Sequence, residues 1–100
     1  MKVDLERMTA HAAEAVALLK AISHEGRLMI LCHLVEGEKS VTELEMLLDS
    51  RQAAVSQQLA RLRQDGLVTA RREGKAIYYA PADDRAGRIV AALHGIYCAD

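Results

Sequence analysis

The sequence predicts a small, mainly helical fold that carries one β-hairpin in its second half. Apolar residues recur at intervals of three and four over most of the chain, which is the spacing of amphipathic helices. Between residues 67 and 80 the period changes to two, which is typical of strands. One hundred residues suit one domain, so we expect residues 1–100 to fold as a single unit.

The first two helices are predicted from the apolar spacing before residue 37. Residues 5–22 form the first helix, and Ser23 is a plausible N-cap for the second. Gly37 is suited to end the second helix, because glycine readily adopts the backbone conformation that follows a helix. The apolar stripe of the second helix consists of Leu28, Leu31, Leu34 and Val35.

Two shorter helices joined by a tight turn should follow. Ser40 or Thr42 can cap the third helix, and Asp49 and Ser50 form the break after it. The fourth helix is expected over residues 52–64, with Gly66 stopping the chain soon after it. Its inward face consists of Val55, Leu59 and Leu62.

The hairpin and a last helix complete the chain. Residues 67–72 and 76–80 are the predicted strands, and Gly74 can adopt the positive φ that the turn between them requires. Asp83 or Asp84 then caps a final helix. The order α-α-α-α-β-β-α is that of a winged helix-turn-helix, in which the hairpin forms the wing.

The charge distribution favours DNA as the partner, although the net charge is only −1. Residues 51–75 contain six basic and two acidic residues, a net charge of +4, whereas the rest of the chain carries −5. Phosphate binding depends on such local patches of positive charge rather than on the total. Ordinary scatter of surface charge is the alternative explanation.

The fourth helix has the composition of a recognition helix, since its first half is small and polar. We expect Gln52, Ser56 and Gln57 to contact base edges in the major groove. Arg61 lies one turn after Gln57 on the same face and should lie nearer to phosphate. The alternative is that this face is simply the solvated side of an ordinary helix.

The basic residues of the hairpin fit the same duplex. Arg71, Arg72 and Lys75 place positive charge near the tip of the ribbon, where it can follow the DNA backbone or enter a minor groove. Tyr78 and Tyr79 are interpreted as packing residues rather than as platforms for bases.

Three segments together resemble the ArsR/SmtB family of bacterial repressors, and the match spans nearly the whole chain. They are LKAISHEGRL at 19–28, AVSQQLARLRQDGLV at 54–68 and RREGKAIYY at 71–79. The resemblance implies a homodimer built from the first and last helices. It also implies double-stranded operator DNA as a partner and an inducer that releases the DNA.

The metal sites known in that family are not intact in this sequence. Ser40 and Thr42 occupy the positions where one type of metal sensor has cysteines, and hydroxyls are poor ligands for soft metals. The last helix offers only Asp83, Asp84 and His94, without the paired histidines of another type. We therefore expect neither a metal nor another cofactor.

The two cysteines, Cys32 and Cys98, resemble those of the persulfide-responsive SqrR/BigR-type subgroup. This resemblance implies that reactive sulfur species, which are inorganic or organic persulfides and polysulfides, bridge the pair. The resulting disulfide or polysulfide would release DNA and switch on sulfide-oxidation genes. The alternative is that each free cysteine is only a small apolar side chain in the core.

Bridging is chemically reasonable if the fold brings the two thiols together from 66 positions apart. A direct disulfide needs Cα atoms within about 7 Å, whereas a polysulfide tolerates a larger separation. Because the last helix belongs to the expected dimer interface, pulling it against the second helix would change the spacing of the two recognition helices.

Two other functions stay open. One is a metal-sensing repressor of the same fold that uses Cys32, His33, His94 and Cys98. The other is a protein-interaction module that no longer binds DNA. An enzyme is not expected, because no catalytic triad, phosphate loop or carboxylate pair is evident. The sequence shows neither a signal peptide nor an apolar run of about 20 residues, so we expect a cytoplasmic protein with reduced thiols.

Overall fold

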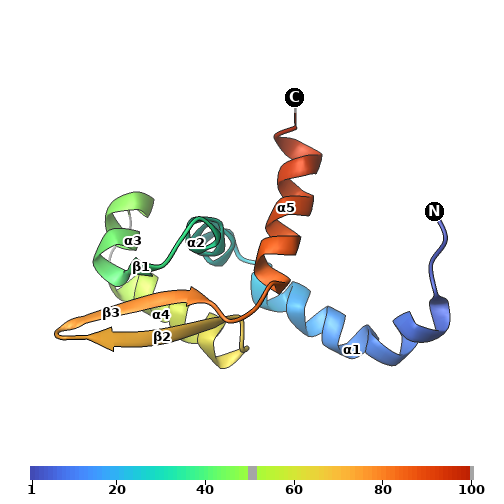
Figure 1. Ribbon diagram of the computed structural model, residues 1–100, viewed down its shortest axis with the longest axis horizontal. Coiled ribbons are helices and arrows are strands. Elements are labelled where there is room, and N and C mark those ends of the chain that lie inside the picture. Colours follow the sequence, from blue (N-terminus) through green and yellow to red (C-terminus); the bar gives the residue numbers. More distant parts are fainter. Residues whose placement is uncertain (50–51, 100) are drawn as a thin grey trace.

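The computed structural model describes residues 1–49 and 52–99, and for residues 52 and 53 the backbone alone. It confirms a mainly helical winged helix-turn-helix and adds one short strand, β1, to the predicted order (Figure 1). The elements are α1 Leu5–Ile22, α2 Glu25–Val35, β1 Lys39–Ser40, α3 Val41–Leu48, α4 Gln52–Gln64, β2 Val68–Glu73, β3 Ala76–Pro81 and α5 Arg85–Tyr97.

The hydrophobic core lies where α2, α3 and α4 meet the base of the hairpin. Among its fully buried side chains are Leu31 of α2, Leu44 of α3 and Leu59 of α4, each with 0% exposure. The predicted inward face of α4 is confirmed, because all three of its residues are buried. The opposite face of α4 is therefore directed away from the protein. The described core consists of Ala21, Ile22, Ile30, Leu31, Leu34, Leu44, Val55, Leu59, Leu62, Leu67, Val68 and Ala86.

The helix ends follow local side-chain chemistry, with one difference from the prediction. His24, not Ser23, is the N-cap of α2, and its Nδ1 accepts a hydrogen bond of 3.0 Å from the Gly26 N–H. Ser23 instead lies at the C-terminal end of α1, where its N–H donates to the Leu19 carbonyl. A histidine ring nitrogen performs here the role that serine or aspartate oxygens usually perform.

The third helix begins with a capping box. The Ser40 hydroxyl accepts from the Glu43 N–H, and the Glu43 carboxylate accepts from the Ser40 N–H. Asp49 ends the helix in the left-handed conformation at φ 49°. For the last helix, Asp84 is the N-cap but makes no side-chain cap bond, while Asp83 accepts from the Arg85 N–H.

The sheet is antiparallel, with the order β1-β3-β2. Glu73 faces Ala76 across the turn, and Gly74 adopts the expected positive φ, at 62°. Strand β1 was not predicted from the sequence; in it Lys39 pairs with Tyr79 and Ser40 with Tyr78. Strand β3 thus connects the wing to the residue that caps α3.

Helix α1 extends away from the rest of the chain, on the side opposite the hairpin (Figure 1). Several of its predicted apolar positions are exposed rather than buried, and so is the end of α5. The clearest cases are Leu5 at 73%, Leu19 at 58%, Ile96 at 69% and Tyr97 at 81%. Within the described residues, no helix combines the length and the apolar character that crossing a membrane requires.

Candidate DNA-binding and thiol sites

The polar face of α4 is accessible in the structure. Ser56, Gln57 and Arg61 are exposed, while the helix is held from behind by its buried leucines. The side chain of Gln52 lies outside the described residues. The structure therefore places three of the four predicted residues of this helix on the surface.

An ion pair on α4 orients Arg61. Its Nε donates at 2.7 Å to Oδ2 of Asp65, which follows directly after the end of the helix. Both side chains remain partly exposed, so the pair stabilises the fold by at most about 1 kcal/mol. The bond directs the Arg61 guanidinium toward the C-terminal end of α4.

Arg71 on the wing is held by two carboxylates, Glu73 of the wing and Glu38 just before β1, a constraint that the sequence did not indicate. Its Nη2 and Nε donate to the two oxygens of Glu38 at 2.6 and 3.1 Å. Its Nη1 donates to Glu73 at 2.6 Å, and its guanidinium lies 4.9 Å from the centre of the Tyr78 ring. These bonds raise the pKa of Arg71 and lower the pKa of the Glu38 carboxyl below its usual range.

The other basic residues near the turn, Arg72 and Lys75, are also exposed. Neither forms an ion pair with any residue in the described part of the chain. They are therefore better placed than Arg71 to meet a phosphate without first breaking a bond inside the protein.

Replacing Glu38→Gln should strengthen binding to duplex DNA several-fold. The change removes a negative charge beside the wing and releases one side of Arg71, which can then contact a phosphate. If it does, the slope of log affinity against log salt becomes steeper by about 0.9 for the added contact. Titration of labelled duplex by fluorescence anisotropy at several salt concentrations measures both quantities.

Glu45→Gln is the matched control for that substitution. It removes the same charge from α3, where Glu45 has no ion pair within the residues described. An equal gain from Glu45→Gln would mean that only net charge matters. No gain from Glu38→Gln would mean that Arg71 is not used on DNA.

Both cysteines line one apolar cavity of about 330 Å³ between α2 and α5. Cys32 is half-buried on α2, whereas Cys98 is exposed at the C-terminal end of α5, and both are free thiols. The fold thus brings together two residues 66 positions apart. The lining residues are Leu28, Cys32, Val35, Glu36, Val90, Leu93, His94, Tyr97 and Cys98.

The surroundings of Cys32 disfavour its thiolate. Burial raises the pKa of the Cys32 thiol above its ordinary value, and the Glu36 carboxylate and Cys98 raise it further. The thiolate is the reactive form of cysteine, so at neutral pH these surroundings reduce the reactivity of Cys32.

Of the four residues of the metal-sensor alternative, three lie at the same cavity. Cys32, His94 and Cys98 line the cavity, but His33 is not among its lining residues. Across residues 1–49 and 52–99, no three His, Cys, Asp or Glu side chains are grouped closely enough to hold a metal ion.

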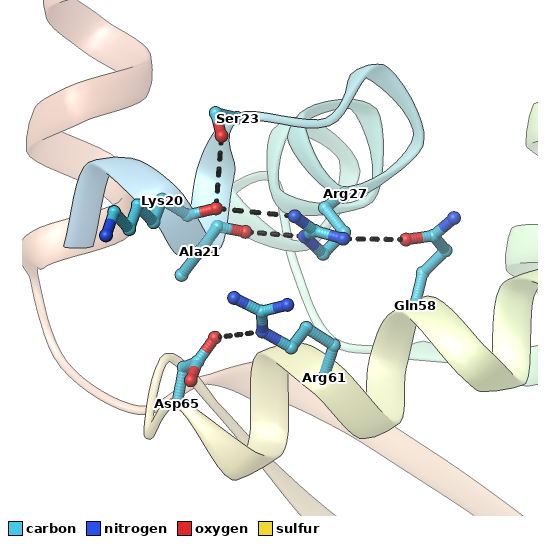
Figure 2. Close-up of polar contacts among 7 residues, drawn as sticks. All are labelled: Lys20, Ala21, Ser23, Arg27, Gln58, Arg61 and Asp65. Carbon is cyan, nitrogen blue, oxygen red and sulfur yellow. Dashed lines mark hydrogen bonds and ion pairs between the residues drawn. The ribbon is translucent and has the colours of Figure 1, made fainter. Parts of the chain in front are cut away.

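A polar cluster between the start of α2 and α4 was not identified from the sequence. Arg27, at the start of α2, donates through Nε to the Ala21 carbonyl at 2.6 Å and through Nη2 to the Lys20 carbonyl at 3.3 Å. Its Nη1 reaches Gln58 Oε1 on α4 at 3.5 Å (Figure 2). Because these partners lie six, seven and 31 positions away, no periodic pattern indicates them.

This cluster borders a polar cavity of about 460 Å³ next to the face of α4 that is expected to contact DNA. The cavity is formed by the N-cap and first turn of α2 and by about two turns of α4, residues 57–64. Its lining residues are His24, Arg27, Gln57, Gln58, Ala60, Arg61 and Gln64. Figure 2 shows Arg27 and Arg61 reaching from different helices toward this region.

Residues 24–70 match the family described as "Bacterial regulatory protein, arsR family". A protein of Agrobacterium fabrum named Biofilm growth-associated repressor is 48% identical over 98% of this chain and 84% of its own length. The transcriptional activator HlyU of Vibrio cholerae is 43% identical over 96% of this chain and 89% of its own. These relatives are named as transcriptional regulators, not as enzymes.

Solved structures agree with the sequence comparisons. The crystal structure of the transcriptional repressor BigR from Xylella fastidiosa superposes with a TM-score of 0.93 at 45% identity, covering 98% of this chain and all of that one. Reduced HlyU from Vibrio cholerae superposes with a TM-score of 0.85 at 43% identity, covering 93% of this chain and 98% of that one.

Proposed function

Because the chain belongs to the ArsR family of bacterial regulatory proteins, we propose that it is a dimeric transcriptional repressor controlled by its two thiols. In this proposal the reduced form binds operator DNA in the cytoplasm. Bridging of Cys32 and Cys98 by reactive sulfur species releases it and switches on sulfide-oxidation genes. The single observation that carries the proposal is that both cysteines line one cavity between α2 and α5.

The DNA-binding part of the proposal rests on two exposed polar surfaces. Helix α4 offers Ser56 and Gln57 for base edges and Arg61 for a phosphate, and Gln52 is proposed for base contact from its sequence position. The wing offers Arg72 and Lys75, and Arg71 once its bonds to carboxylates open. Together these groups make the repeated contacts to backbone and bases that specific binding requires.

The dimer is proposed to form through α1 and α5. Both helices expose large apolar side chains, among them Leu5, Leu19 and Ile96. Contact of such a surface with water is unfavourable, and large exposed apolar patches mark interaction sites. A second copy of the chain would bury them and would set two copies of α4 about 34 Å apart, the spacing of successive major-groove faces.

The sulfur chemistry needs only a persulfide as the oxidant. The Cys98 thiolate attacks the outer sulfur of an organic persulfide, whose S–S bond breaks to release a thiol. The Cys32 thiolate then attacks the sulfur that Cys98 itself contributes, and hydrogen sulfide leaves as the disulfide forms. The two cysteines lose two electrons in total, and one sulfane sulfur gains them.

A longer bridge forms if the Cys98 persulfide first takes a sulfur from a second persulfide. Attack by Cys32 on the middle of its three sulfurs then gives a trisulfide and again releases hydrogen sulfide. Either bridge links α2 to α5 across the cavity. Because α5 belongs to the proposed dimer interface, the link changes how the two copies of α4 are held relative to each other.

The test is the effect of an organic persulfide on DNA binding by wild-type, Cys32→Ser and Cys98→Ser proteins. The wild-type protein should lose affinity by about 5- to 150-fold, the usual range of such coupling, and both variants should stay bound. Intact-protein mass spectrometry should show an intramolecular bridge in the wild type alone. Release of both variants by the persulfide would end the proposal.

A further inference from the structure

We infer that Arg27 is a positioning residue that holds the DNA-reading helix α4 in a fixed orientation on the end of α1. The inference rests on the proposed function, since it assigns α4 to DNA and α1 to the dimer. It concerns residues that lie outside the predicted DNA-binding and thiol sites. Figure 2 shows the contacts that support it.

Arg27 binds the C-terminal end of α1 at two points. Helix-end carbonyls have no partner inside their own helix and carry the negative end of its dipole. The guanidinium meets two of them, the Ala21 carbonyl at 2.6 Å and the Lys20 carbonyl at 3.3 Å. Ser23 Oγ donates to the same Lys20 carbonyl at 3.2 Å. The Arg27 guanidinium therefore binds the C-terminal end of α1 to α2 through two of its N–H groups.

The third contact of Arg27 crosses to α4. Nη1 donates to Gln58 Oε1 at 3.5 Å, and Gln58 lies between the exposed Gln57 and the buried Leu59. A tilt or rotation of α4 that re-aims Gln57 would thus have to break or stretch this bond. The Arg27 side chain is half-buried, which limits competition from water.

Close packing at Gly26 limits movement of the same joint. A Cβ added there would lie 3.1 Å from His24 Cε1 and 3.4 Å from Gln58 Nε2. The first turn of α2 therefore lies within van der Waals reach of the Gln58 side chain, whose Nε2 is also 3.4 Å from Nε2 of the N-cap residue His24. Arg27 and Gly26 together keep α4 at one distance from the α1–α2 corner.

Lysine cannot replace Arg27 in this role. A guanidinium donates in several fixed directions at once, and here those directions lead to two helices. An ammonium keeps the charge but not the fork. If Arg27 served DNA only through its charge, lysine would suffice, so Arg27→Lys separates positioning from direct phosphate contact.

The experiment measures affinity of the reduced protein for a duplex of about 30 base pairs, selected by the wild-type protein from a random library, which spans two half-sites. We expect Arg27→Lys and Gln58→Ala each to weaken binding about tenfold with an unchanged salt slope, because no phosphate contact is lost. Arg7→Lys is the matched control, since Arg7 contacts only Asp4 at the start of α1 among the described residues.

The double variant Arg27→Lys/Gln58→Ala should lose less than the product of the two single losses, because both changes break one shared contact. Wild-type affinity in Arg27→Lys would overturn the inference. Full additivity of the two single losses in the double variant would also overturn it. So would a salt slope that falls by about one in Arg27→Ala but not in Arg27→Lys, because such a fall marks the loss of a direct phosphate contact.

Amide hydrogen exchange tests the role of Arg27 without DNA, and therefore independently of the proposed function. If the wild-type protein selects no duplex, the proposed function fails, and exchange alone decides about Arg27. Arg27→Lys should then speed exchange in α4 and at the end of α1 while the unfolding midpoint and the other helices change little. Unchanged exchange in α4 would overturn the inference in either case.

Discussion

Replacing Gln57→Ala and Arg61→Ala together is expected to weaken specific DNA binding by about 10²- to 10³-fold. A good side-chain contact to a base edge is worth about 1–3 kcal/mol, and loss of a phosphate-contacting arginine adds to it. Both side chains are exposed on the face of α4 away from the core, so the fold should survive. Competition titrations with specific and random duplexes measure the loss.

Arg63→Ala is the control for that double variant. It removes the same charge from the same helix, but Arg63 is exposed outside the polar cavity that Gln57 and Arg61 line. Specific binding should be nearly intact in Arg63→Ala. Should the double variant bind as the wild type does, α4 would not contact the bases, and a protein-interaction module would become the better description.

Cys98 should react with persulfide before Cys32, so Cys98→Ser should markedly slow the first step at pH 7. The Cys32 thiol has a raised pKa, and each unit by which a pKa exceeds the pH lowers the thiolate fraction tenfold. A higher pKa makes the remaining thiolate more nucleophilic, but with a coefficient of about 0.4–0.5 this gain is smaller than the loss. Accessibility favours the exposed Cys98 as well.

The pH dependence of the reaction rate at Cys32 tests this order of reaction. In Cys98→Ser the rate at Cys32 should rise about tenfold per pH unit until the pH reaches the raised pKa of that thiol. Glu36→Gln should speed the same reaction, because it removes a carboxylate that disfavours the thiolate, whereas Glu6→Gln on α1 should not. Timed alkylation with mass spectrometry follows both thiols. Equal initial rates in Cys32→Ser and Cys98→Ser would contradict this order.

Sequence periodicity predicted the helices well because an amphipathic helix repeats its apolar residues every three to four positions, whether a core or another surface covers them. The bounds of α1 and α4 agree with the prediction to the residue. The two-residue strand β1 was missed, since so short a strand has no period and exists only through its pairing with β3. The N-cap of α2 was placed one residue early, because histidine is an uncommon cap and serine a frequent one.

In the candidate sites too, features set by local helix geometry could be predicted, whereas contacts between residues far apart in the sequence could not. Exposure of Ser56, Gln57 and Arg61 follows from helical geometry, so the sequence could predict it. The pairing of Arg71 with Glu38 joins residues 33 positions apart and depends on how the wing packs. For α1 the helical period was right, but it did not distinguish a core face from a surface exposed in the single chain.

Ser40 belongs to two units at once, because its backbone pairs with Tyr78 of the wing while its hydroxyl caps α3. A hairpin that bends to follow a wider or narrower minor groove therefore pulls directly on the first turn of the helix-turn-helix. The effects on affinity of base changes at the wing contact and at the α4 contact should consequently be non-additive. An operator mismatched at both places would then bind with an affinity that the two single mismatches do not predict.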